Sequence, residues 1–179
     1  MKVKLISYSK PTDSISNDGI DNAQELVAFC ARVSNPSNQL NTETSEKLIK
    51  YLIKNAHWSP LEMVSACLEI ETTRDIARQI LRNRSFSFQE FSQRYANPVE
   101  DLEFVIREAR LQDPKNRQNS ISTDNEKIIE EWEQMQSTVI DKATEVYNWA
   151  IENGIAKEQA RSVLPEGNTV SRILSLIHI

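Results

Sequence analysis

Apolar residues recur along the chain at two spacings, which separate predicted helices from predicted strands. The longest helical pattern runs from Asp124 to about Asn153, and its apolar residues recur at steps of three and four. These residues are Ile128, Trp132, Met135, Val139, Ala143, Tyr147 and Ala150. Asp124 is a candidate N-cap, and Asn153-Gly154 is typical of a left-handed helix end. The pattern predicts one long amphipathic helix with this stripe turned toward a core.

Shorter patterns predict further elements on both sides of that helix. Helices are expected after the cap Asp21, over residues 44–55 and over residues 156–163. The apolar positions of the first two helices are Leu26, Phe29, Cys30 and Val33, then Leu48, Tyr51 and Leu52. Alternation of apolar and polar residues predicts strands over residues 3–8, 63–71 and 102–106.

Composition describes an ordinary soluble globular chain with an acidic balance. The 179 residues are 39% hydrophobic and 26% charged, and the net charge is −5. An acidic chain is a poor binder of bulk nucleic acid or membrane surface, although one small phosphorylated ligand can still bind at a local basic site. The N-terminus lacks the apolar core of a signal peptide, and no stretch approaches transmembrane length. We therefore expect a chain with no nucleic-acid partner and no membrane partner.

The cysteines and histidines are too sparse for a metal site. Cys30 and Cys67 are isolated, which favours a reduced, cytoplasmic setting in which each is a small buried residue. His57 and His178 are the only histidines, and no cluster has metal-ligand spacing. We expect no structural metal.

A basic stretch from Arg74 to Tyr95 stands out in this acidic chain. It holds five arginines against two acids, a local balance of 5 − 2 = +3. Arg74, Arg78 and Arg82 follow at steps of four, so a helix places them on one cationic face. Guanidinium groups beside serine hydroxyls are the donors that phosphate needs. The alternative is a surface helix whose arginines lie along its apolar surface.

The loop over residues 107–120 is also open to two interpretations. It is either a solvated loop or a loop that faces a ligand.

Three motifs in order resemble those of a known enzyme family. Arg82-Asn83-Arg84, followed after seven residues by Ser92, is similar to the Arg-His-Arg signature of flavin-dependent thymidylate synthases. Gln89-Glu90 and Arg94-Tyr95 extend the match. The flanking motifs are His57-Trp58-Ser59-Pro60-Leu61-Glu62 and Ala160-Arg161-Ser162-Val163-Leu164-Pro165.

The resemblance implies a fold, a reaction and a set of site residues. The fold is α+β, a mainly antiparallel sheet flanked by helices, in a homotetramer whose active sites lie between subunits. The reaction is reductive methylation of dUMP to dTMP with methylenetetrahydrofolate and NADPH-reduced FAD, in which the cofactors supply the difficult chemistry. The residues implied for dUMP are Gln79, Arg82, Glu90, Ser92, Arg94 and Arg161. Those implied for FAD are Ser59, Arg82, Asn83, Arg84 and Glu90, with His57 at the mouth of the flavin and folate site.

The sequence departs from the family pattern at two positions in the signature. Asn83 stands where the family has histidine, which removes a group that can carry charge near neutral pH. Gln89 replaces the more usual asparagine, a milder change. We expect Asn83 to weaken flavin binding or flavin reactivity.

The end of the chain does not continue the family pattern. We expect one synthase-like domain over residues 1–173, and a non-native tail over Leu174–Ile179 that reads like a translated transposon adapter used in library preparation. The arginine with which the family activates the uracil ring would then lie beyond Arg172, and this form would be inactive. A native stop codon directly after Ile179 in genomic DNA would contradict this interpretation.

A second function remains open at this point. A non-catalytic nucleotide- or RNA-binding module would grip phosphates with the arginines of residues 82–95 and stack bases on Phe86, Phe88 and Phe91. The net negative charge and Glu90 count against it. A helical scaffold protein, the third alternative, would bind neither flavin nor nucleotide.

Overall fold

The computed structural model describes residues 1–178, with the side chains of residues 1–177. The chain divides into two compact units. Unit 1 consists of Met1, Glu71–Arg82 and Glu90–Arg172, and unit 2 consists of Lys2–Ile70, Asn83–Gln89 and the residues from Ile173 onward. The predicted boundary after residue 173 falls inside a strand, and the origin of the last six residues stays a prediction.

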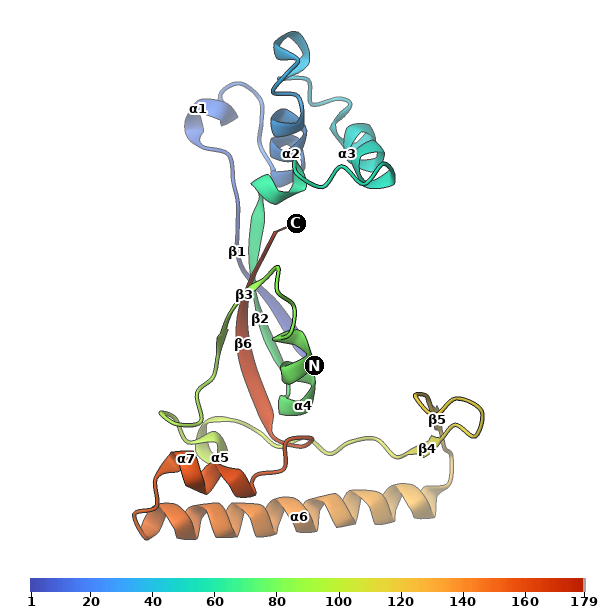
Figure 1. Ribbon diagram of the computed structural model, residues 1–179, viewed down its shortest axis with the longest axis vertical. Helices are drawn as coiled ribbons and strands as arrows, with labels where there is room; N and C mark the ends of the chain where they lie inside the picture. Colours follow the sequence, from blue (N-terminus) through green and yellow to red (C-terminus); the bar gives the residue numbers. More distant parts are fainter. Residues whose placement is uncertain (179) are drawn as a thin grey trace. The chain divides into compact units, whose positions relative to one another are not determined.

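Four strands form the main sheet, in the order β1-β2-β6-β3. Their bounds are Lys2–Tyr8 for β1, Ser65–Thr73 for β2, Ser87–Glu90 for β3 and Val170–His178 for β6 (Figure 1). This sheet and the helices confirm the predicted α+β class with a mainly antiparallel sheet. No helix among the described residues is long and apolar enough to cross a membrane.

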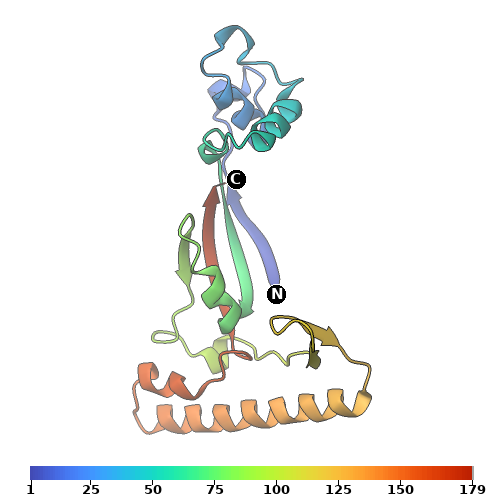
Figure 2. The same cartoon turned by 45° about the vertical axis from the view of Figure 1, so that its right-hand side comes forward.

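Unit 1 is built on the long helix α6 (Glu126–Glu152), which confirms the longest predicted element. Asn125, rather than Asp124, caps it, because its side chain accepts a hydrogen bond from Ile128 N–H at 3.3 Å. After the C-cap Asn153, Gly154 has φ +76°, the left-handed conformation expected there. Helix α7 (Lys157–Ala160) and the 3-10 turn η3 (Arg161–Val163) run beside α6 in Figures 1 and 2.

The predicted apolar stripe of α6 is buried over only half of its length. Ala143, Tyr147 and Ala150 are at most 8% exposed and form a core with Ala160 and Leu164. The first half of the predicted stripe is exposed: 38% for Ile128, 45% for Trp132, 63% for Met135 and 53% for Val139. In that half Gln136, one position along the helix from Met135, faces inward at 5% exposure. The predicted stripe is therefore buried only over the half of α6 on which Phe104, Ala160 and Leu164 pack.

The remaining elements of unit 1 are short. They are α4 (Arg74–Ile80), α5 (Pro98–Asp101), and the antiparallel hairpin of β4 (Arg110–Gln112) and β5 (Ser120–Ser122). The strand predicted over residues 102–106 is wrong, because only an isolated bridge between Phe104 and Thr169 forms there. Phe104 instead packs on the α6 core, so its apolar character serves side-chain packing rather than strand pairing.

Unit 2 places its helices around a second core. These are α1 (Asp13–Ser16), α2 (Ala23–Ala31), η1 (Pro36–Asn38), α3 (Ser45–Lys54) and η2 (Leu61–Met63). Val27, Leu52 and Val64 are each at most 5% exposed and form the centre of that core.

Three details of the unit 2 prediction are corrected. The cap of α2 is Asn22, which accepts from Glu25 N–H at 3.0 Å, whereas Asp21 N–H donates to the Glu25 carboxylate. Tyr51 is 56% exposed because Leu48 and Leu52, one turn apart, define the inner face of α3. Val33 is 68% exposed because α2 ends at Ala31, before the helical pattern reaches it.

Candidate functional site

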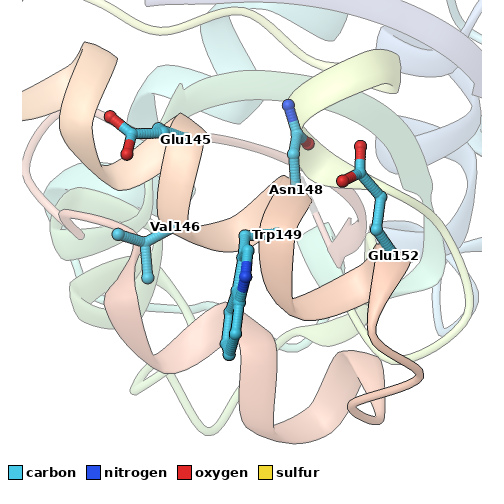
Figure 3. Close-up of a pocket in the computed structure, with 5 residues that line it drawn as sticks. All are labelled: Glu145, Val146, Asn148, Trp149 and Glu152. Carbon is cyan, nitrogen blue, oxygen red and sulfur yellow. The ribbon is translucent and has the colours of Figure 1, made fainter.

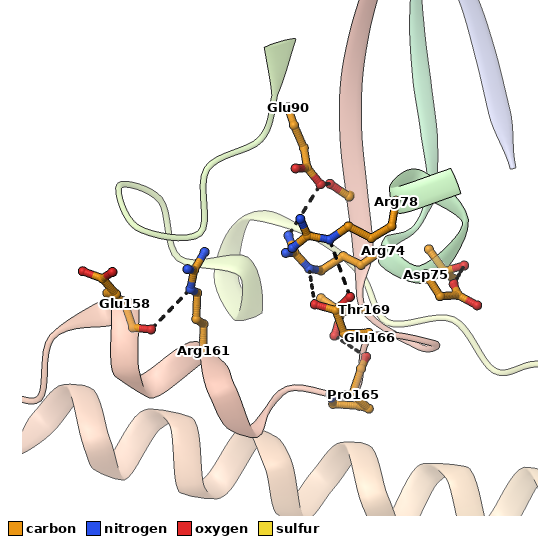
Figure 4. Close-up of polar contacts among 11 residues, drawn as sticks. Arg74, Asp75, Arg78, Glu90, Glu158, Arg161, Pro165, Glu166 and Thr169 are labelled. Atoms are coloured by element: carbon orange, nitrogen blue, oxygen red, sulfur yellow. Dashed lines mark hydrogen bonds and ion pairs between the residues drawn. The ribbon is translucent and has the colours of Figure 1, made fainter. Parts of the chain in front are cut away.

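The basic stretch begins with an arginine that is buried rather than presented to solvent. Arg74 is the first residue of α4 and is 4% exposed. Its Nε donates to Glu166 Oε1 at 3.2 Å, and its Nη1 lies 3.7 Å from Glu90 Oε1 (Figure 4). Its backbone N–H donates to Thr169 at 2.9 Å. A buried guanidinium requires such partners, so Arg74 is neutralised inside unit 1.

Glu90 is held from two sides at the end of β3. Besides the ion pair with Arg74, its Oε1 accepts a 2.9 Å hydrogen bond from Ser171 Oγ, and Ser171 is fully buried. The Glu90 side chain keeps 21% of its surface exposed. A carboxylate fixed in this way is already oriented before any ligand arrives.

The predicted cationic face is therefore divided. Arg78 is half exposed and its Nε lies 3.7 Å from Glu166 Oε2, so it shares that carboxylate with Arg74. Helix α4 ends at Ile80, and Arg82 follows in a turn where its Nη1 donates to Gln79 Oε1 at 2.9 Å. Gln79 and Arg82 lie together as predicted, and both are exposed. Arg74 lies on the buried side of α4 together with Ala77, whereas Arg78 lies on the exposed side.

A second pair of predicted residues meets at α7. Arg94 Nη2 lies 3.6 Å from Glu158 Oε2, and Arg161 Nε donates to the Glu158 backbone carbonyl at 3.3 Å. Figure 4 shows the Arg161 guanidinium directed away from α6. Arg94 is 60% exposed, so the attraction to Glu158 is screened by solvent. Two guanidinium groups that converge on one residue, each with free donors, can bind a phosphate.

The loop between β3 and α5 fixes Ser92 beside Arg94. The Ser92 carbonyl accepts from Tyr95 and Ala96 N–H, and its Oγ accepts from Arg94 N–H at 3.4 Å. Gln93 between them is 3% exposed, and its Nε2 has no hydrogen-bond partner among the described residues. Gln93 is therefore buried between a half-buried Ser92 and an exposed Arg94.

The residues predicted for FAD belong to both units. Arg82 and Glu90 belong to unit 1, as above. In unit 2, Asn83 Oδ1 accepts from Ser85 N–H at 3.1 Å, and the exposed Arg84 follows it. Ser59 is exposed in the turn before η2.

His57 follows the end of α3, and its backbone N–H donates to Leu52 at 2.9 Å. Its ring meets the ring of Tyr51 edge-on, with centroids 6.1 Å apart. His57 is exposed, so the ring is accessible from solvent despite that contact.

Most of the loop over residues 107–120 belongs to the β4–β5 hairpin, whereas Arg107 at its start donates to Thr73 at 2.8 Å. Asn119 and the backbone N–H groups of Lys115 and Asn116 donate to Asp113, which lowers the pKa of its carboxyl group. Arg110 donates to Ser120 across the hairpin. Because these polar groups bind their own turn, the structure favours the solvated-loop interpretation.

The sequence analysis did not identify three residues of these clusters, Glu158, Glu166 and Ser171. It also did not predict that Arg74 is buried. Arg74 and Glu166 are 92 positions apart in the chain, and Glu90 and Ser171 are 81 positions apart. The pairing of Arg74 with Glu166 follows from tertiary packing and had no local signal. Among the described residues, no group of three or more His, Cys, Asp or Glu side chains forms a metal site.

Comparison with solved structures indicates which class of protein has this fold. The chain is similar to the crystal structure of a UMP/dUMP methylase, PolB from Streptomyces cacaoi bound with 5-Br dUMP, with a TM-score of 0.76 and 26% identity over 99% of this chain and 72% of that one. This is the α+β fold of a nucleotide methylase.

The sequence comparisons identify the family. The family profile of thymidylate synthase complementing proteins matches residues 17–175. A probable flavin-dependent thymidylate synthase of Paramecium bursaria Chlorella virus 1 is 48% identical over 92% of this chain and 74% of its own length. The flavin-dependent thymidylate synthase of a Synechocystis strain is also 48% identical, over 97% of this chain and 77% of its own length. The chain belongs to the flavin-dependent thymidylate synthase family.

Proposed function

We propose that this protein methylates dUMP to dTMP as a flavin-dependent thymidylate synthase. The observation that carries the proposal is the convergence of Arg94 and Arg161 on Glu158, next to the half-buried Ser92. Two fork-shaped donors and a hydroxyl suit a nucleotide monophosphate, and the resemblance to the family implies a dUMP role for the same three residues.

The remaining dUMP residues would recognise the nucleoside. Gln79 and Arg82 hold each other at 2.9 Å and expose amide and guanidinium donors. Glu90, fixed by Arg74 and Ser171, offers an acceptor oxygen for a ribose hydroxyl. A preoriented acceptor costs little ordering entropy when the ligand binds.

The exposed donors around residues 82–84 fit a flavin dinucleotide. The resemblance to the family supports Arg82 and Arg84 as the groups that would neutralise its pyrophosphate, Asn83, Ser59 and Glu90 as its hydrogen-bonding residues, and His57 as a residue of the flavin and folate access. In this proposal FAD reduced by NADPH supplies the hydride and methylenetetrahydrofolate supplies the carbon. The protein would act in the cytoplasm as a homotetramer whose subunits share these sites.

One structural feature weighs against the alternative of a non-catalytic RNA-binding module. Phe86 and Phe88, two of its three stacking candidates, pack edge-to-face on each other with centroids 6.2 Å apart and are only partly exposed. Bases need open aromatic faces to stack on, and this pair uses part of its surface internally.

Binding spectroscopy tests the proposal without depending on turnover. Purified protein is loaded with FAD, dialysed and titrated with dUMP while the visible absorbance is recorded. We expect a retained flavin spectrum that shifts with dUMP, and a shallow salt dependence because only one phosphate is bound. Flavin retention without any response to dUMP, or a steep salt slope with single-stranded RNA, would contradict the proposal.

Asn83 provides a second, independent test of the flavin half of the site. Restoring the family residue with Asn83→His is expected to raise FAD retention, because imidazole adds a group that can carry charge near neutral pH. Asn83→Gln is the matched control, since it keeps the amide and should leave retention unchanged. Equal retention by both variants would show that position 83 does not contact the flavin.

A further inference from the structure

Helix α7 contacts the loop of residues 92–96 through two side chains that are neighbours in the sequence. Lys157 Nζ donates to the Tyr95 backbone carbonyl at 2.9 Å. Glu158 Oε2 lies 3.6 Å from Arg94 Nη2. Consecutive residues of α7 therefore hold consecutive residues of the loop, although Lys157 and Tyr95 are 62 positions apart in the chain.

A bound nucleotide would affect these two contacts differently. The Arg94 guanidinium is one of the proposed phosphate ligands, so a phosphate competes with Glu158 for it. The Tyr95 carbonyl is a hydrogen-bond acceptor and has nothing to donate to an anionic phosphate. The contact from Lys157 therefore persists when Arg94 exchanges Glu158 for the ligand.

The ammonium group of Lys157 is committed to this carbonyl. The side chain is partly buried, and among the described residues it forms no ion pair with a carboxylate. A hydrogen bond from a charged donor is stronger than one between neutral groups. Lys157 thus uses its charge to hold backbone rather than to balance an acid.

The loop fixes its own shape but not its distance from α7. The Ser92 carbonyl accepts from the Tyr95 and Ala96 N–H groups, which closes a turn within the loop. Helix α7 has a fixed place, because Ala160 and Leu164 are at most 7% exposed and pack in the α6 core. A contact between the two therefore ties the loop to a packed element of unit 1.

The distance between the loop and α7 also sets the distance between two proposed phosphate ligands. The loop carries Arg94, whereas Arg161 lies in η3 directly after α7, and its Nε donates to the Glu158 carbonyl at 3.3 Å (Figure 4). A phosphate that accepts from both guanidinium groups binds best when their separation is already correct.

We propose that Lys157 is a positioning residue for nucleotide binding. It holds the loop of residues 92–96 on α7 and so keeps Arg94 and Arg161 at the spacing that one phosphate needs, without contacting the nucleotide itself. The inference rests on the proposed function for the identity of the ligand, dUMP.

Substitutions at Lys157 test this role against a matched loss of charge. Lys157→Met removes the donor and keeps an apolar stem, whereas Lys157→Arg keeps a charged donor. The control is Lys142→Met, which removes the same charge from α6, where Lys142 lies 2.6 Å from Glu145. Figure 3 shows Glu145 in the wall of a hollow whose lining residues all belong to α6, so the control changes a surface to which the loop does not contribute.

Two measurements on the full chain are compared, dUMP affinity by calorimetry and hydrogen–deuterium exchange of residues 91–97 without ligand. We expect Lys157→Met to bind dUMP about three- to tenfold more weakly and to exchange faster in the loop, because one hydrogen bond that fixes the loop is lost. The ratio to the parent affinity should be equal at low and high salt, since a position rather than a long-range charge has changed. Lys157→Arg and Lys142→Met should resemble the parent in both measurements.

Several results would overturn the inference. Unchanged loop exchange in Lys157→Met does so at any affinity, as does an unchanged affinity in a chain whose parent binds dUMP. A loss that Lys142→Met reproduces, or that disappears at high salt, also overturns it, because the charge then acts through its field. A parent that binds no dUMP overturns the proposed function instead, and loop exchange in Lys157→Met then still decides whether Lys157 holds the loop.

Discussion

Two groups of arginines in the same unit show opposite ways of holding a positive charge. Arg74 is 4% exposed and lies between Glu90 and Glu166, so its charge is satisfied by the protein itself. Arg94 and Arg161 both contact Glu158, but Arg94 is 60% exposed and its ion pair is 3.6 Å long. Arg74 and Arg94 belong to the basic stretch and Arg161 to a flanking motif, and nothing in the local sequence indicates that Arg74 is the buried one.

The difference separates residues that build the site from residues that are available to a ligand. A buried arginine between two carboxylates has few free donors for phosphate, and it fixes Glu90 instead. Arg94 loses little when it leaves Glu158, because a surface ion pair contributes at most about 1 kcal/mol. The structure therefore predicts stability defects from the first group and binding defects from the second.

The largest effect is expected for Arg74→Met. Removing Arg74 from this ion-paired cluster leaves Glu90 without its ion-pair partner and leaves Glu166 paired with Arg78, which costs about 3–5 kcal/mol. Urea unfolding measures the free energy of unfolding. Arg78→Met is the matched control, because Arg78 pairs with the same Glu166 but is half exposed and should cost less than about 1 kcal/mol. Equal losses for both variants would contradict the distinction between buried and exposed arginines.

Ser171→Ala tests the other support of Glu90. Ser171 is fully buried and donates to the carboxylate at 2.9 Å, and loss of a hydrogen bond to a charged group costs about 1.5–3 kcal/mol. Ser175, four residues along the same strand, is 1% exposed, but its hydroxyl has no partner among the described residues. Ser175→Ala should therefore be neutral or slightly stabilising in the same urea titration. A larger loss for Ser175→Ala than for Ser171→Ala would show that strand packing, and not the bond to Glu90, sets the stability.

Arg94→Ala and Arg161→Ala address binding instead of stability. Each removes one charge-assisted phosphate contact, for which we expect about tenfold weaker dUMP binding by calorimetry and little change in unfolding. Arg117→Ala, in the exposed turn of the β4–β5 hairpin, removes the same charge elsewhere in the unit and controls for the overall field. If all three variants bind dUMP like the parent, the phosphate does not bind beside Glu158.

The long helix and the site residues show how far local sequence patterns reach. The 3.6-residue period predicted α6 within two residues at each end, because such patterns depend only on neighbours along one helix. The same pattern could not show that Ile128 to Val139 remain exposed, since burial depends on which other elements pack there. Short stretches failed for the same reason, as at residues 102–106, where Phe104 packs on a helix instead of pairing in a strand.

The candidate site was predicted through its motifs, and its internal supports were not. Gln79 and Arg82, and likewise Arg94 and Arg161, are brought together in the structure. The carboxylate partners of Arg74 could not be predicted, because Glu90 and Glu166 reach it only through the tertiary fold. Chain separation, rather than residue type, decided which side chains were missed.

The smallest expected effect belongs to Glu158→Gln, and it tests whether Arg94 is available to a ligand. The substitution removes the carboxylate that lies 3.6 Å from Arg94 but keeps the backbone carbonyl that Arg161 contacts. Arg94 then no longer exchanges an ion pair for the phosphate, so dUMP should bind about two- to threefold more tightly at low salt, and the gain should shrink as salt screens the competing pair. In an Arg94→Ala background the same substitution should change nothing, because the two residues form one coupled pair. An equal gain with and without Arg94 would mean that Glu158 repels the nucleotide directly, and that Arg94 is as firmly committed to the protein as Arg74.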